Sequence, residues 1–402
     1  MENSQTLTLI QNKAKEIHKD VLKIREHLHM YPELSFQEKE TSSYIAGVLT
    51  SCQIPFTTGW AGYGIVAVIE GENPGKNLGL RGDMDALPIQ ESSDTFYKSR
   101  NPGVMHACGH DVHTSCLLGA AMILQSVKKF IKGNIVLIFQ PGEEKLPGGA
   151  GIMIKEGVIE KYQLNAIIAQ HVYPSMETGN VGVRSGLYMA SADEIYITVQ
   201  GKGGHAAMPH ECVDTILMAS QVLVNLQQIV SRNAPPAVPS VLSFGKFNSD
   251  GGATNVIPDK VFIEGTFRTM DEKWRKKAHA RIVQIVEETV ASFGGICEVR
   301  IETGYPCLIN EPELTKKVKS DACHYLGEKH VEELPLRMTS EDFSFFSQHL
   351  PATFYRLGTG NKSKGIVSPV HTSNFDVDAD ALRVGSGLMA WVALCRINDM
   401  SE

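Results

Sequence analysis

Residues 133–144 read GNIVLIFQPGEE, and this stretch decides the fold class. Residues 135–139 are all apolar, without the polar alternation of a half-exposed strand. Such a run predicts a strand buried on both faces, as in a parallel sheet covered by helices. Pro141 and Gly142 end the strand, and Glu143 and Glu144 follow at once. The stretch therefore predicts a buried parallel strand that delivers two carboxylates to one edge of a sheet.

The surrounding sequence repeats this pattern. Similar apolar runs lie at 64–71, 76–83 and 165–172, and helical stretches at 114–130 and 148–159 alternate with them. This alternation predicts an α/β domain with a largely parallel sheet. Nearer the N-terminus, residues 7–30 have helical apolar spacing, and Ser35 with Glu38 predicts a capping box that opens a helix over 37–52.

The rhythm changes after about residue 185. Residues 193–304 read as strand, helix, strand, strand, helix, strand, which is the order of a ferredoxin-like α+β domain. We therefore expect an inserted domain at 186–300 that splits the α/β domain into 1–185 and 301–402. In the last segment, Pro312 opens a helix, and 378–397 predicts an amphipathic helix.

Composition excludes several classes of protein. The chain has 402 residues, a net charge of −7 and 43% apolar residues, which is typical of a two-domain globular protein. The acidic balance disfavours nucleic acid or an anionic membrane as partner. There is no signal-peptide pattern and no membrane-spanning apolar run, and eight scattered cysteines without CxxC pairs are typical of reduced thiols. We expect a cytoplasmic protein.

Polar residues follow each predicted parallel strand. Asp83 and Asp85 come soon after NLGL at 77–80, Glu143 and Glu144 after NIVLIFQ at 134–140, and His171 directly after AIIAQ at 166–170. In open α/β sheets, ligands bind beyond the carboxyl ends of the strands. Taken singly, these residues are more often turn, solvated or core residues. Their joint occurrence predicts one shared site.

The sequence MHACGHDVH at 105–113 adds Cys108 and His110. A cysteine nucleophile is disfavoured, because a histidine two residues away rarely reaches the sulfur. A structural zinc site would need CxxC-like spacing, which is absent. An open metal site fits better, since Gly109 allows a bend that points both side chains the same way. Tandem glutamates suit hydrolysis, in which one binds metal and the other takes a proton from water activated by the metal.

Nine motifs in order carry a resemblance to a known family. They read RGDMDALPI, MHACGHD, QPGEE, AQHVYP, GKGGHAAMPH, NVIPDK, GTFRT, MTSEDFSFF and SPVHTSNFD. The chain resembles, from about residue 20 to 395, the hippurate hydrolase and indole-acetyl-amino-acid amidohydrolase branch of the aminoacylase-type di-metal peptidases. The resemblance implies a di-metal peptidase domain split by a lid and dimerisation domain.

The resemblance also implies residue roles. Glu143 is the general base of a site that holds two divalent metal ions, zinc or manganese, with nickel or cobalt also compatible. Cys108 stands where the wider clan has a bridging aspartate, which implies a thiolate bridge. Asp83 replaces a usual histidine ligand, so it is not assigned as one, and Asp85 orients a ligand from behind. The implied metal ligands are Cys108, His110, Glu144, His171 and His371.

In the inserted domain, the resemblance implies that His205 binds the oxyanion, often across a dimer interface, and that Asn255 and Arg268 receive the substrate carboxylate. A guanidinium can hold a carboxylate by two parallel hydrogen bonds. The alternatives are a solvated loop histidine for His205 and an ordinary surface ion pair for Arg268. Around Cys108, we expect supporting or capping roles for His106, Asp111 and His113, and a core position for Cys116.

The expected protein is a homodimeric, metal-dependent amidohydrolase that cleaves N-acyl-L-amino acids to a carboxylate and a free amino acid. Its partner is this small molecule, with neither nucleic acid nor membrane. A metallo-dipeptidase or aminopeptidase on the same scaffold is the alternative, and it would need an acidic partner for a free α-amine. A non-catalytic binding protein is disfavoured, because Glu143 and all the implied ligands are present.

Overall fold

The structure, a computed structural model, describes residues 2–401 and divides into two compact units. The large unit runs through Tyr188 and continues over Ile309–Pro335 and from Asp342 onward, and the small unit is Met189–Leu308 with Leu336–Glu341. The sequence pattern predicted boundaries at 185/186 and 300/301. It did not assign 336–341 to the inserted segment.

An eight-stranded sheet forms the centre of the large unit, in the order β1-β2-β4-β3-β5-β16-β6-β15. The four middle strands, β4, β3, β5 and β16, are parallel, whereas β2 is antiparallel to β4, and β6 to β16. The expected α/β fold with a mostly parallel sheet is confirmed. The strands are β1 Phe56–Trp60, β2 Gly64–Glu70, β3 Asn73–Asp83, β4 Lys132–Gln140, β5 Ala166–Glu177, β6 Val181–Val183, β15 Val331–Glu333 and β16 Ala352–Gly360.

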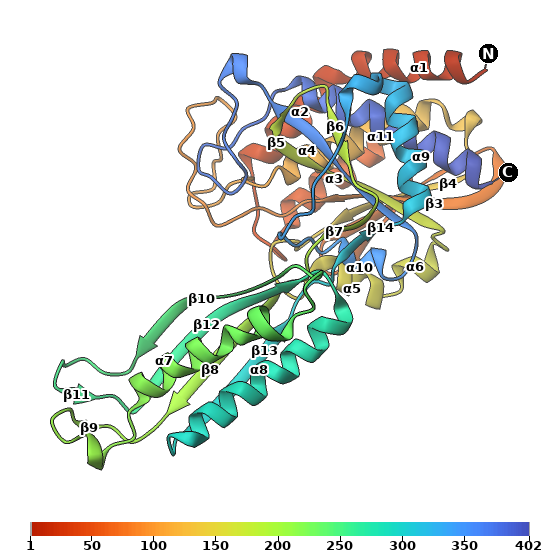
Figure 1. Cartoon of the computed structure of the whole chain (residues 1–402). Helices are drawn as coiled ribbons and strands as arrows, with labels where there is room; N and C mark the ends of the chain where they lie inside the picture. The colour runs from red at the N-terminus through yellow and green to blue at the C-terminus, as the bar shows by residue number, and fades with distance from the viewer. Residues whose placement is uncertain (1, 402) are drawn as a thin grey trace. The chain divides into compact units, whose positions relative to one another are not determined.

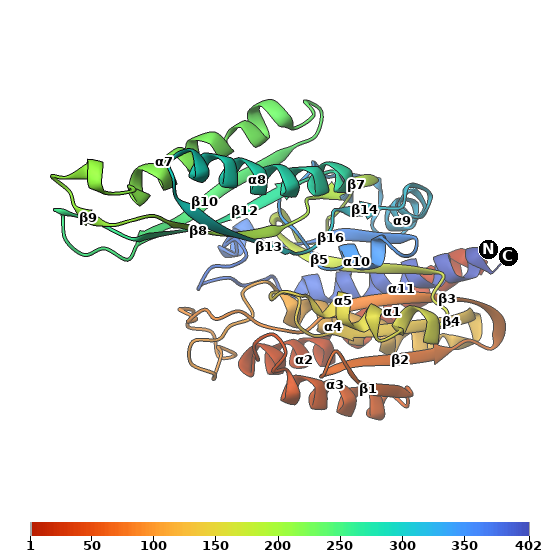
Figure 2. The same cartoon turned by 90° about the horizontal axis from the view of Figure 1, so that it is seen from below.

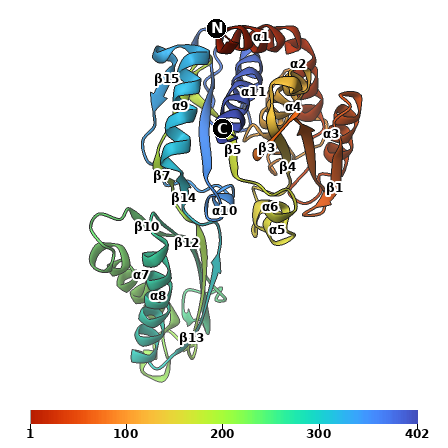
Figure 3. The same cartoon turned by 90° about the vertical axis from the view of Figure 1, so that its right-hand side faces the viewer.

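Helices α4 and α11 pack against this sheet and against each other, with α1 and α2 outside them (Figure 3). Helix α11 is buried on nearly all sides, because the sheet, α1, α4 and α9 surround it. The expectation of an amphipathic final helix was therefore wrong. The helices of the large unit are α1 Glu2–Glu16, α2 His18–Met30, α3 Lys39–Ser51, α4 His110–Ser126, α5 Gly149–Lys155, α6 Val158–Lys161, α9 Pro312–Leu326, α10 Ser344–Ser347 and α11 Asp380–Met400.

The small unit has a four-stranded antiparallel sheet in the order β10-β12-β8-β13, and α7 and α8 cover one face of it (Figure 2). This order, with the succession β-α-β-β-α-β along the chain, is ferredoxin-like. Two short strands, β9 and β11, pair at one end of the unit (Figure 1). The elements are β8 Asp193–Gln200, β9 Gly204–His205, α7 Thr215–Leu226, β10 Ser240–Ser249, β11 Val256–Ile257, β12 Lys260–Thr269, α8 Glu272–Ser292 and β13 Ile296–Thr303. Strands β7 Gly186–Met189 and β14 Leu308–Asn310 pair with each other, and each includes a point where the chain passes from one unit to the other.

The predicted capping box at Ser35 and Glu38 was wrong. The Ser35 hydroxyl donates to Asp85 at 2.6 Å, and the Glu38 carboxylate accepts the Gly142 backbone N–H at 2.8 Å. Both side chains are therefore used by residues beside the site rather than by the start of α3. Within residues 2–401, no helix is both long enough and apolar enough to span a bilayer.

Candidate metal centre

The parallel strands bring the predicted site residues to one level of the sheet. Arg81 of β3 pairs with Ala169 of β5, so Asp83 and His171, each two residues further on, lie level. Asp83 also pairs with Gln140, the last residue of β4, which places Glu143 and Glu144 just beyond the same edge. The carboxyl ends of these strands thus meet as the sequence predicts for a ligand site in an α/β sheet.

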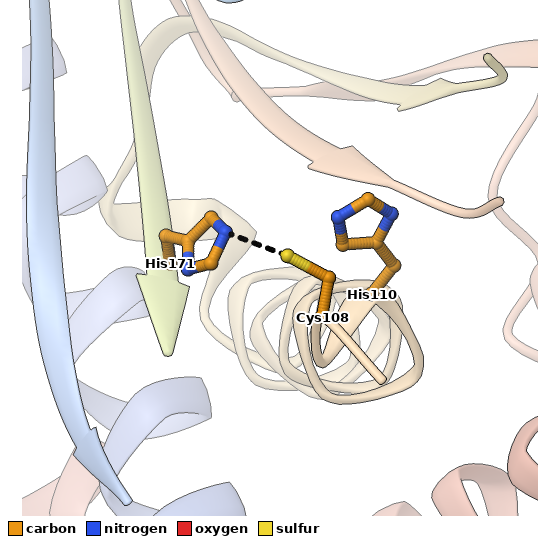
Figure 4. Close-up of side chains that lie close together, drawn as sticks. All are labelled: Cys108, His110 and His171. Carbon is orange, nitrogen blue, oxygen red and sulfur yellow. Dashed lines mark hydrogen bonds between the residues drawn. The ribbon is translucent and has the colours of Figure 1, made fainter. Parts of the chain in front are cut away.

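Gly109 makes the turn that joins Cys108 to helix α4. Its φ is +82°, in the left-handed region, and a β-carbon there would lie 2.6 Å from Val172 Cγ2. Only glycine meets both demands, and α4 then begins at His110, four residues earlier than expected from sequence. Figure 4 shows Cys108 and His110 at the start of this helix, with the sulfur directed towards His171. The Cys108 Sγ to His171 Nε2 distance is 3.5 Å.

His371 reaches the same sulfur from a loop after β16. Its backbone N–H donates to Ala107 O at 2.7 Å, and its own φ of +64° is left-handed. The ring Nε2 lies 3.3 Å from Cys108 Sγ and 3.5 Å from Glu144 Oε1. All five implied metal ligands therefore lie around one point, although they come from four separate segments of the chain.

Two groups of three potential ligands share the Cys108 sulfur: Cys108 with His110 and His171, and Cys108 with Glu144 and His371. His110 Nε2 and Glu144 Oε1 are buried, lie 3.8 Å apart and have no hydrogen-bond partner in the described chain. Buried polar atoms without partners are costly unless something binds them. Thiolate, imidazole and carboxylate together suit zinc and similar divalent ions, so these residues fit a metal centre.

Hydrogen bonds behind the site fix the orientation of both buried imidazoles. The His110 Nδ1–H donates to Asp85 at 3.1 Å, and Asp85 also accepts the Glu144 backbone N–H at 3.0 Å. His171 Nδ1 donates to the Val172 carbonyl at 2.8 Å. The Nε2 atom of His171 therefore faces Cys108 and that of His110 faces Glu144. In metal-bound histidines, a hydrogen bond to the other ring nitrogen usually fixes the ring in this way.

The carboxylates around Cys108 and His110 give the site an excess of negative charge, which favours a bound cation. Burial alone would lower the pKa of His110, but Asp83, Asp85 and Glu144 together raise it to about 10. Burial, Glu144 and Glu143 raise the pKa of the Cys108 thiol. Excess negative charge thus favours a proton on each of these groups. A divalent cation in the same place would displace both protons and leave the ligating forms.

Asp83 and His113 are committed to other partners. Asp83 accepts from Arg81 Nη1 at 2.6 Å and from His113 Nδ1 at 2.5 Å, and His113 Nε2 accepts the Val172 backbone N–H at 2.9 Å. Although burial would raise the pKa of Asp83, Arg81, His110 and His113 hold it well below its usual range. Both ring nitrogens of His113 and both carboxylate oxygens of Asp83 therefore have protein partners, although the two residues form, with His110, another group of potential ligands.

The remaining residues of the stretch at 105–116 are buried. Asp111 accepts from Arg25 at 2.9 Å and from His29 at 2.7 Å, in an ion-pair network behind α4. Neither ring nitrogen of His106 has a hydrogen-bond partner among the described residues. Cys116 is fully buried within α4.

Glu143 is 7% exposed and lies with His110 and Glu144 in a third group of potential ligands. One of its carboxylate oxygens accepts the backbone N–H of Asp342 at 3.4 Å. The sequence pattern indicated no role for Asp342 or Arg81, and it predicted a helix cap rather than a place beside the site for Ser35 and Glu38. The signal for Asp342 was its place in the motif MTSEDFSFF, which was noted only as part of the resemblance.

In the small unit, His205 and Asn255 lie together, because His205 pairs with Val256 across β9 and β11. Arg268 lies near the opposite end of β12, where its Nη1 donates to Met338 O at 3.4 Å and to Ser340 Oγ at 3.2 Å. None of the described carboxylates forms an ion pair with Arg268. The structure thus separates two residues, Asn255 and Arg268, that were expected to bind the same carboxylate.

A sheet edge that brings a thiol, imidazoles and carboxylates together is typical of metal-dependent hydrolases, and comparison with known proteins identifies the family. Residues 79–394 match peptidase family M20/M25/M40, and the chain belongs to this family. The resemblance seen in the motifs is therefore confirmed.

Three similar proteins illustrate the relationship. The N-acyl-L-amino acid amidohydrolase of Geobacillus stearothermophilus is 42% identical over 74% of this chain and 80% of that protein. The N-acetyl-L-cysteine deacetylase of Bacillus subtilis is 41% identical over 85% of this chain and 81% of that protein. The solved structure of Bacillus subtilis YXEP, described as a dinuclear metal binding peptidase, is 30% identical, with a TM-score of 0.81 over 96% of this chain and 99% of that one.

Proposed function

We propose that this enzyme hydrolyses the amide bond of N-acyl-L-amino acids, with two divalent metal ions held by Cys108, His110, Glu144, His171 and His371. One observation carries the proposal: two groups of potential ligands share the Cys108 sulfur, and the Glu143 carboxylate lies beside them. Relatives named amidohydrolase and deacetylase support the reaction class. Zinc and manganese are the proposed metals, and nickel and cobalt fit the same donors.

Each group has a separate task in this reaction. When bound, the metals supply Lewis acidity and lower the pKa of a water molecule towards about 7. Glu143 is the general base, which takes a proton from the attacking water and returns it to the leaving amine. His205 donates to the oxyanion. Its Nδ1 accepts the Ala207 backbone N–H at 3.1 Å, so the neutral ring carries its proton on Nε2, where it is free to donate.

Arg268 is the proposed partner of the substrate carboxylate. Its guanidinium is partly buried and contacts a carbonyl and a hydroxyl, so its charge has no neutralising partner in the described chain. A carboxylate that binds there completes a charge-assisted hydrogen bond. This recognition favours acyl amino acids with a free carboxylate. A dipeptidase or aminopeptidase would also need an acid for the substrate amine.

A substrate panel tests the reaction. The N-acetyl amino acid, its carboxamide and the matching glycyl dipeptide are compared by kcat/KM with zinc, manganese, nickel or cobalt added. We expect the N-acetyl amino acid to be best, and Arg268→Gln to lower its kcat/KM by about 10- to 100-fold with little effect on the carboxamide, because a charged hydrogen bond is lost. Preference for the dipeptide would favour the peptidase alternative.

Geometry within the small unit favours a homodimer. Lys260 and Arg268 are eight residues apart on β12, which corresponds to about 26 Å along the strand. His205 and Asn255 lie beyond the Lys260 end, so they are at least this far from Arg268. One small substrate does not span that distance. We infer that His205 and Asn255 serve the site of a second copy, so that the small unit is both lid and dimerisation domain. Its exposed apolar residues Ile216, Leu217 and Val224 on α7 fit such an interface.

Mixed dimers test this assignment. Glu143→Gln and His205→Ala proteins, each inactive alone, are unfolded, mixed in equal amounts and refolded. If His205 acts in the partner's site, half of the dimers are mixed and each has one intact site, so about a quarter of wild-type activity returns. Each variant refolded alone is the control. If the mixture stays as inactive as its components, His205 does not act across a dimer.

A cytoplasmic location is proposed from the thiols. All eight cysteines are free, and Cys108 must stay reduced to bind metal. The reducing cytoplasm provides that condition.

A further inference from the structure

Asp342 has a buried carboxylate, close to Glu143, that accepts hydrogen bonds from several directions. It is fully buried and accepts hydrogen bonds from Arg81 Nη2 at 2.8 Å, from Gln140 Nε2 at 2.7 and 2.9 Å, and from the Ala150 backbone N–H at 3.0 Å. These donors come from β3, β4 and α5. The residue is thus fixed to three elements of the large unit.

The backbone of this residue faces the proposed general base. Its N–H donates to Glu143 Oε1, and the four hydrogen bonds on its side chain leave that N–H little freedom to move. Arg81 also donates a hydrogen bond to Asp83, which accepts another from His113. One guanidinium therefore contacts both Asp342, beside Glu143, and Asp83, beside the proposed ligand His110. A general base acts well only when its oxygen is held in reach of the proton.

We propose that Asp342 is a positioning residue: its clamped carboxylate fixes the backbone N–H that orients Glu143 for proton transfer. This inference rests on the proposed role of Glu143. Asp342 acts on kcat through Glu143, and it leaves metal binding and substrate affinity unchanged.

Asp342→Asn is the first test. An amide keeps the volume of the carboxylate but turns an NH₂ donor towards donors of Gln140, Arg81 or Ala150, so the clamp loosens. We expect kcat to fall by about 10- to 100-fold, with KM and metal content unchanged within about twofold. The matched control is Asp321→Asn, since Asp321 is also a buried acid bound by arginine (Arg396 Nε, 2.6 Å) but lies on α9. It should leave kcat unchanged.

A double-mutant cycle separates positioning from general structural damage. In the Glu143→Gln background, Asp342→Asn should cost less than about twofold in kcat, because the group it positions is gone. An equal loss in both backgrounds, a loss of metal, or no loss in either would overturn the inference. If Glu143→Gln alone keeps normal turnover, the proposed general base fails instead, so the two failures are distinguishable.

A milder variant decides the matter if Asp342→Asn does not fold. Gln140→Met removes two of the hydrogen bonds to Asp342 and keeps its ion pair with Arg81. We expect a fall in kcat of about 3- to 10-fold that again disappears in the Glu143→Gln background. The same fall in both backgrounds would overturn the inference.

Discussion

Glu143→Gln should lower kcat for N-acyl amino acid hydrolysis by about 10³-fold while both metals stay bound. The amide has nearly the shape of the carboxylate but does not accept a proton from water. The proposed ligands Cys108, His110 and Glu144 are unchanged, so metal content should equal that of the wild type. Steady-state kinetics and metal analysis of the purified protein check both statements.

The adjacent Glu144→Gln is the matched control. Glu144 Oε1 is a proposed ligand, so this variant should lose metal as well as activity. The same substitution at two neighbouring glutamates is thus expected to keep the metal in one variant, Glu143→Gln, and to release it in the other, Glu144→Gln. Near-normal turnover of Glu143→Gln, or equal metal loss in both variants, would show that the two roles are misassigned.

Hydrogen peroxide should release metal and abolish activity together, because oxidation of Cys108 removes the sulfur shared by both ligand groups. Cys108→Ala should bind little metal for the same reason. Cys108→Asp should keep metal and measurable activity and resist peroxide, because a carboxylate can bridge two cations and is not oxidised. Activity and metal content are followed after peroxide treatment and gel filtration.

The other seven cysteines remain in Cys108→Asp and serve as an internal control. If peroxide inactivates this variant as fast as the wild type, another thiol is responsible. Inactivation of the wild-type enzyme with full retention of metal would also contradict a sulfur ligand.

The sequence was most informative where a local pattern determines the structure. Apolar runs predicted the parallel strands β3, β4 and β5, and the run in β4 is uninterrupted over 135–139, because strands buried on both faces have little polar content. Strand β16 was missed, since Arg356 and Thr359 interrupt its apolar pattern, although every residue of it is buried. Arg356 is tolerated there because its Nε donates to the Tyr188 hydroxyl at 3.0 Å.

The site was predictable only in part, for the same reason. Cys108 and His110 are close in sequence and share a glycine turn, so their convergence could be expected. Ser35 and Glu38 looked like a helix cap, because their actual partners, Asp85 and Gly142, are 50 and 104 residues away. Single-sequence reasoning does not detect such pairings, and it likewise gave Asp342 no role.

The six residues 336–341 make the small unit discontinuous, so it is not a removable cassette. Ala190 and Arg268 both hydrogen-bond this segment, so it belongs structurally with residues far upstream. A chimaera that takes only residues 189–308 from a relative would place the relative's residue at position 268 against the native segment 336–341. The hydrogen bonds that Arg268 makes to this segment would then not be matched on both sides. Exchange of substrate preference between relatives should therefore require both pieces to be transplanted together.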